Sequence, residues 1–69
     1  MEWTAIRSSN LREAGFDAKS SELEIVFADG GRYRYRDVPE SVYRGLISAP
    51  SAGRYFHQRI RDVYPYIRV

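Results

Sequence analysis

The chain has 69 residues, with 11 lysine and arginine residues against nine aspartates and glutamates, for a formal net charge of +2. This length leaves room for one domain, residues 1–69, whose core must come from one sheet face and one or two helices. The absence of cysteine excludes disulfides, a thiolate nucleophile and cysteine metal sites. No apolar run approaches the roughly 20 residues that span a bilayer, and the start lacks a basic region followed by an apolar one, so we expect a cytoplasmic domain without membrane association.

The positive charge gathers in the second half of the chain. Residues 1–31 hold three basic residues and six acidic ones, whereas residues 32–69 hold eight arginines and three acidic residues. Ten of the eleven basic residues are arginines. Because the planar guanidinium group pairs with phosphates and stacks on bases, this composition favours an anionic partner.

Residues 11–17, 23–28 and 32–38 alternate apolar or aromatic residues with polar ones, which predicts three strands. Residues 18–22 form the first turn and Asp29-Gly30-Gly31 the second. A three-residue second turn keeps apolar side chains together, pairing Phe27 with Tyr33 and Ile25 with Tyr35, and places Gly31 at a left-handed bulge position.

Two helices are predicted after the strands. Asp37 is the expected cap of the first helix, with Pro39 in its first turn and an end near Ser48. Ser51 is the expected cap of a second helix, whose apolar side includes Phe56 and continues to Val63. Residues 3–7 and 66–69 alternate enough to be short edge strands. The predicted fold is α+β: a three-stranded antiparallel meander, with extra edge strands at the termini, followed by two helices packed on one sheet face.

In this arrangement Tyr33 and Tyr35 face the helices, and the opposite face displays Arg32, Arg34 and Arg36. Side chains at alternate strand positions are about 7 Å apart, close to the phosphate repeat of an extended nucleic-acid strand. The alternative is a solvated sheet face in which Arg36 pairs with Glu24. Tyrosines on a sheet stack on unpaired bases in several RNA-binding modules, but the register favours a core position for these two rings.

The segment 51–55 offers another candidate site. Free amides at the start of the second helix attract anions, and Arg54 lies within its first turn; ordinary capping and close packing at Gly53 is an equally good explanation. Arg59 and Arg61 on the same helix, and Arg44 on the first helix, extend the basic surface, although helix arginines are usually just solvated. His57 is the only histidine, and no serine lies on a nucleophile turn, so we predict no catalysis, no cofactor, no metal and no ligand-sized pocket for a small-molecule substrate.

Several short motifs follow one another in an order that resembles a known family. They are Ser8-Ser9-Asn10, Gly15-Phe16-Asp17, Leu-x-Ile-x-Phe at 23–27, the turn glycines, Tyr33-Arg34-Tyr35, Val38-Pro39 and Ser51-x-Gly53-Arg54-Tyr55-Phe56. From Ser8 to about Tyr66 the chain resembles the KTSC domain, found at the C-terminus of some lysyl-tRNA synthetases and as a free-standing bacterial or phage-encoded protein. The resemblance marks Tyr33, Tyr35, Pro39, Ser51, Gly53, Tyr55 and Phe56 as family residues, and the family it points to has no established activity. His57 stands where we expect Asn in many members.

The attachment of the family to a tRNA enzyme implies RNA as the partner, tRNA-like or otherwise structured. We therefore predict a non-catalytic RNA-binding module that uses Arg32, Arg34, Arg36, Arg54 and Arg59. The alternative is a protein-interaction or self-association module that uses an edge strand or an aromatic patch of Trp3, Tyr64 and Tyr66.

Overall fold

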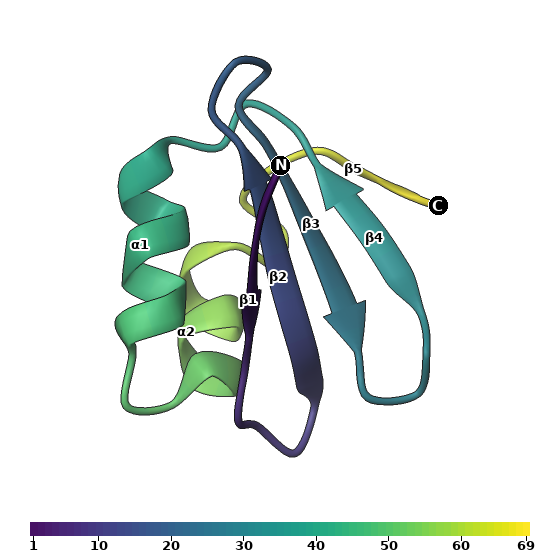
Figure 1. Ribbon diagram of the computed structural model, residues 1–69, viewed down its shortest axis with the longest axis vertical. Coiled ribbons are helices and arrows are strands. Elements are labelled where there is room, and N and C mark those ends of the chain that lie inside the picture. The colour runs from purple at the N-terminus through teal and green to yellow at the C-terminus, as the bar shows by residue number, and fades with distance from the viewer.

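The computed structural model describes all 69 residues and contains one five-stranded antiparallel sheet and two helices. The strands are β1 (Glu2–Ala5), β2 (Leu11–Asp17), β3 (Glu22–Phe27), β4 (Arg32–Tyr35) and β5 (Tyr66–Arg68). The helices are α1 (Glu40–Ser48) and α2 (Ala52–Arg59). Strand order follows the sequence from β1 to β5, and both helices lie on one side of the sheet (Figure 1). The predicted α+β meander with two helices is confirmed, and both terminal stretches form edge strands.

The turn between β3 and β4 has the predicted length but lies one residue earlier. The Phe27 amide donates to the Gly31 carbonyl over 2.8 Å, so the loop is 28–30, and Gly30 rather than Gly31 has the positive φ, at 94°. Each β3 residue therefore pairs two positions earlier on β4 than predicted, and Ile25 lies opposite Tyr33. A shift of two residues leaves every side chain on its predicted face, because side chains alternate with period two.

The core lies between the sheet and the helices, where rings fill most of the space. Tyr43 of α1 is fully buried and stacks on Phe16 of β2, with ring centroids 5.3 Å apart. Leu23 and Ile25 are also fully buried beneath the helices. Stacked rings of this kind add about 0.5–1.5 kcal/mol to the free energy gained from buried area, which suits a core as small as this one.

The helix termini match the sequence in one case and differ in the other. Ser51 caps α2 as predicted, since its hydroxyl accepts a hydrogen bond from the Arg54 amide. Asp37 does not cap α1: it has a φ of 60°, and the residue at the N-cap is Pro39, without any side-chain cap. The second helix ends at Arg59, so Val63 is exposed instead of continuing the apolar side of α2. Neither helix has the length and apolar composition needed to cross a membrane.

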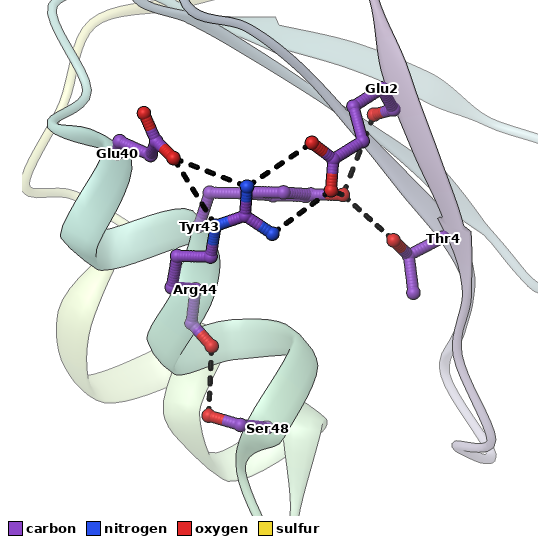
Figure 2. A network of polar contacts seen from close by, with 6 residues as sticks. All are labelled: Glu2, Thr4, Glu40, Tyr43, Arg44 and Ser48. Atoms are coloured by element: carbon purple, nitrogen blue, oxygen red, sulfur yellow. Dashed lines mark hydrogen bonds and ion pairs between the residues drawn. The ribbon is translucent and has the colours of Figure 1, made fainter.

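A polar network fixes the edge strand β1 to α1 (Figure 2). The Tyr43 hydroxyl lies 2.7 Å from the Thr4 hydroxyl, and the Arg44 guanidinium lies 3.0 Å from Glu2 and 3.2 Å from Glu40. Hydrogen bonds to Glu2, and then to Glu40, raise the pKa of Arg44 above its usual value. Both carboxylates that face Arg44 are thus occupied within the domain, and Arg44 is committed to holding β1 in place.

Candidate nucleic-acid interface

Glu24 lies between two arginines on the sheet face opposite the helices, here called the open face. Its carboxylate is 2.9 Å from Arg32 and 3.1 Å from Arg34, and only 6% of its side chain is exposed. The predicted pair of Glu24 with Arg36 is wrong, because the shifted turn places Arg34 directly opposite Glu24. Burying a carboxylate is costly unless it is paired, so these two arginines are needed where they are.

Trp3 of β1 lies on the same open face, in the same row across the sheet as Glu24. It pairs with Gly15, and a Cβ at Gly15 would lie 2.7 Å from two carbons of the Trp3 ring, so only glycine lets the ring lie this close. The guanidinium of Arg32 lies 5.8 Å from the ring centroid of Trp3. The buried Glu24 of β3 is thus surrounded by an indole, a glycine and two arginines that come from three other strands.

The open face is not basic as a whole. Strand pairing puts four carboxylates and three arginines on it: Glu13, Asp17, Glu22 and Glu24, with Arg32, Arg34 and Arg36. Of the three arginines only Arg36 makes no ion pair. The line of arginines read from the sequence exists in space, but its charge is offset by neighbouring carboxylates.

A groove with a volume of about 600 Å³ lies on the helix side of the molecule. Phe56 and His57 of α2 form one wall, Tyr33 and Tyr66 of β4 and β5 form another, and the turn at residues 28–31 closes one end. The prediction that no ligand-sized depression exists is therefore wrong. Drug-sized ligands occupy clefts of about 300–1,000 Å³, so the groove is large enough for part of a macromolecular ligand or for a small molecule.

Three tyrosines line this groove with different exposure. Tyr35 is 4% exposed, as predicted for a core residue, while Tyr33 is half-buried and Tyr66 is 53% exposed. The Arg68 guanidinium lies 5.8 Å from the centroid of the Tyr33 ring, and the Tyr66 ring is tilted against Tyr35 with centroids 5.4 Å apart. Burial, reinforced by the hydroxyl groups of Tyr66 and Tyr33, raises the pKa of Tyr35 to about 12.

Two basic and two acidic residues line the groove: Arg61 and Arg68, with Asp29 and Asp62. Arg61 lies 3.2 Å from His57 Nδ1. Arg54 is exposed and precedes His57 by three residues, so the two are neighbours on the helix surface. Arg59 is exposed as well, and neither Arg54 nor Arg59 is among the residues that line the groove.

The aromatic patch predicted from Trp3, Tyr64 and Tyr66 is not assembled. Trp3 lies on the open face at one edge of the sheet, whereas Tyr66 lies on the helix side at the other edge, next to Tyr35. Sequence proximity to the termini suggested the grouping, and the alternation of the two edge strands separates it.

The model of the KTSC domain family matches residues 7–64. The chain belongs to the KTSC domain family. A crystal structure of a KTSC domain protein from Yersinia pestis superposes with a TM-score of 0.94 at 31% identity, covering 99% of this chain and 96% of that one.

Two kinds of relative match this KTSC domain. An uncharacterized protein from Stutzerimonas stutzeri is 40% identical over 70 residues, covering 100% of this chain and 99% of its own. A lysine–tRNA ligase from Trichormus variabilis is 34% identical over 58 residues, which are 84% of this chain and 10% of the ligase. Sequences similar to this chain therefore occur both as nearly an entire protein and as a small segment of an enzyme.

The KTSC motif residues divide between the groove and the core. Tyr33, Tyr35, Gly53 and Phe56 all line the groove. Tyr55 instead packs so closely against Gly45 of α1 that a Cβ there would overlap its ring. The sequence predicted the individual residues, but no local pattern indicated that four of them meet at one depression together with His57, which follows Phe56, and with Tyr66, which neighbours them only in the fold.

Proposed function

We propose that this KTSC domain binds single-stranded RNA along the groove beside α2. The observation that carries the proposal is an aromatic groove with arginines at its margin. Arg68 makes no ion pair, and Arg61 reaches only the exposed Asp62 carboxylate, at 4.0 Å. Aromatic rings for bases and cations for phosphates are the two components that single-strand binding surfaces combine.

The relatives support the same class of partner. A segment of a lysine–tRNA ligase is 34% identical to this chain, and that enzyme acts on tRNA by its name. This likeness supports RNA as the partner, and the groove supports the site at which RNA is bound. Binding rather than catalysis is supported by His57, whose polar contact is Arg61, since no carboxylate orients it as a base.

The structure changes which arginines carry the proposal. Arg32 and Arg34 stabilise the buried Glu24 carboxylate, so they are less available to phosphates than the sequence suggested. Arg54 remains, because α2 contains no acidic residue that could pair with it, and Arg61 and Arg68 join it because they line the groove. Arg36 and Arg59 do not line the groove and become comparison positions.

Salt dependence gives the expected size of the effect. For single strands, log affinity falls against log salt with a slope of about −0.7 for each phosphate contacted. Three contacts, from Arg54, Arg61 and Arg68, give roughly a 20-fold loss of affinity between about 50 and about 200 mM salt.

The test is a titration of a labelled, unstructured RNA at these two salt concentrations with two matched double variants. Arg61→Gln/Arg68→Gln removes two charges at the groove, and Arg36→Gln/Arg59→Gln removes two away from it. We expect the groove variant to lose affinity and to show a slope smaller by about 1.4, with little change in the comparison variant. Equal losses in both variants, or no RNA binding by the unaltered domain, would contradict the proposal.

A second candidate, self-association through the open face, is favoured by its exposed apolar side chains. Met1, Trp3 and Ile67 are each 42–50% exposed, and Trp3 and Ile67 occupy the same row across the sheet. Association driven by apolar area persists at high salt, unlike phosphate binding. Sedimentation equilibrium at the two salt concentrations separates the candidates: a salt-independent dimer that Trp3→Ser disrupts supports association, and a monomer throughout excludes it.

A further inference from the structure

We infer that the groove accepts one unpaired nucleobase, which stacks on Tyr66 and forms a hydrogen bond with the Tyr35 hydroxyl. This inference rests on the proposed RNA binding and names the chemical group that one part of the groove receives. It follows from the unused hydrogen-bonding groups of the groove, from the exposure of one ring, and from the position of the arginines.

Tyr35 presents a hydroxyl without a partner. The residue is 4% exposed, yet its hydroxyl makes no hydrogen bond within the chain. Because no side-chain oxygen or nitrogen is both fully buried and unpartnered, this oxygen must reach the surface, and Tyr35 lines the groove. The raised pKa, about 12, keeps the hydroxyl protonated at neutral pH, so it both donates and accepts.

The surroundings of this hydroxyl suit a heterocycle better than a phosphate alone. Tyr35 packs against the rings of Phe56 and Tyr66, with centroids 5.9 and 5.4 Å away. A neutral hydroxyl among rings matches the polar edge of a ligand whose faces are apolar, which describes a nucleobase. Asn10 also lines the groove, and its side-chain amide makes no hydrogen bond within the chain, so it offers a second donor and acceptor to a base edge.

Tyr66 is the ring available for stacking. More than half of this residue is exposed, whereas the Tyr33 ring lies beneath the Arg68 guanidinium. Arg68 and Arg61 line the same groove, so the phosphates on either side of the bound base would lie near cations. A base within a duplex has its faces stacked and its pairing edge occupied, so the ligand must be an unpaired base.

The probe is an RNA pentamer that carries one 2-aminopurine in an otherwise abasic backbone, compared with the same pentamer made fully abasic. The two ligands share all phosphates and differ in a single base. We expect the base to tighten binding about 5- to 150-fold, the range for one stacked base, and its fluorescence to be quenched on binding.

Four variants assign the contact, each checked for folding by circular dichroism and thermal unfolding. Tyr66→Leu should remove most of the affinity difference between the two pentamers, and Tyr66→Phe should retain it. Tyr35→Phe keeps the ring and removes the hydroxyl, for an expected loss of about 2- to 13-fold with the base-containing pentamer only. Trp3→Leu alters the exposed ring of the open face and should change neither the affinity nor the quenching.

Equal affinity of the two pentamers overturns the inference while leaving salt-dependent RNA binding intact. The same holds if Tyr66→Leu weakens both pentamers equally, because Tyr66 would then act on the backbone, or if Trp3→Leu abolishes the quenching. A blunt RNA duplex that competes as well as a single strand also overturns it. If neither pentamer binds and the longer RNA also fails, the inference falls together with the proposed function.

Discussion

Replacing Glu24 with glutamine tests how much the buried carboxylate contributes to stability. The substitution keeps the size of the side chain and removes the charge that Arg32 and Arg34 share. Hydrogen bonds to charged groups contribute about 1.5–3 kcal/mol, and fully exposed ion pairs about 0–1 kcal/mol. The arginine side chains are 50% and 37% exposed, so water compensates them in part. We therefore expect a loss of about 2 kcal/mol in the free energy of unfolding.

For a domain of this size a loss of about 2 kcal/mol lowers the melting temperature by about 8–16 °C. Thermal unfolding followed by circular dichroism measures it, with Glu13→Gln as the comparison. Glu13 lies on the same face and forms no ion pair, so its substitution should change the melting temperature little. A double-mutant cycle with Arg34→Gln should return a coupling energy of about 1 kcal/mol.

The reasoning is refuted if Glu24→Gln unfolds at the same temperature as the unaltered domain. It is also refuted if Glu13→Gln costs as much, since the loss would then reflect the charge of the whole face rather than the pairing of Glu24. A coupling energy near zero would show that Arg34 does not stabilise the carboxylate.

Two further measurements test the packing of the helices and the groove. Gly45→Ala should destabilise the domain by about 1–3 kcal/mol, because its Cβ would overlap Tyr55. Gly53→Ala should stabilise the domain by about 0.5–1 kcal/mol, because its Cβ meets Ser8 at an ordinary 3.6 Å. A similar change in stability in both variants would contradict this contrast. The pKa of Tyr35 is raised from 10.0 to about 12, so its contribution to stability is complete below pH 10 and is lost as the pH rises toward 12. Unfolding by denaturant at pH 9 to 12 measures that loss, and Tyr35→Phe should flatten it; a profile that Tyr35→Phe leaves unchanged contradicts the assignment.

Local patterns predicted most of the fold. Alternation gave β2 its observed bounds, and Ser51 caps α2 because a hydroxyl before an apolar helical pattern is a strong local signal. The turn was placed one residue late because Gly30 and Gly31 both satisfy the same sequence rule. Since a shift of two pairing positions preserves every face, the hydrophobic pattern could not detect the error.

The misplaced turn led to a wrong pairing partner for Glu24 at the candidate site. Cross-strand partners depend on the absolute register. The predicted register therefore placed Arg36 opposite Glu24, whereas Arg34 is opposite Glu24 in the structure. The groove lay further beyond prediction, because Asn10, Tyr35, His57 and Tyr66 are separated by 9 to 25 residues and meet only after the sheet and helices pack. No local periodicity carries that information.

The arginines and tyrosines of β4 lie on opposite faces of the sheet and have different roles. On β4, Arg34 lies on the open face and pairs with the buried Glu24 carboxylate. The next residue, Tyr35, has its ring in the core and lines the groove. On the open face Arg32 and Arg34 are already paired and gain little from releasing counterions of a nucleic acid. The groove has the unpaired Arg68, the weakly paired Arg61 and polar groups without partners, so it has free energy of binding still to gain. The groove beside α2, where hydrogen-bonding groups remain unused, is therefore a better candidate interface than the open face, where the arginines align.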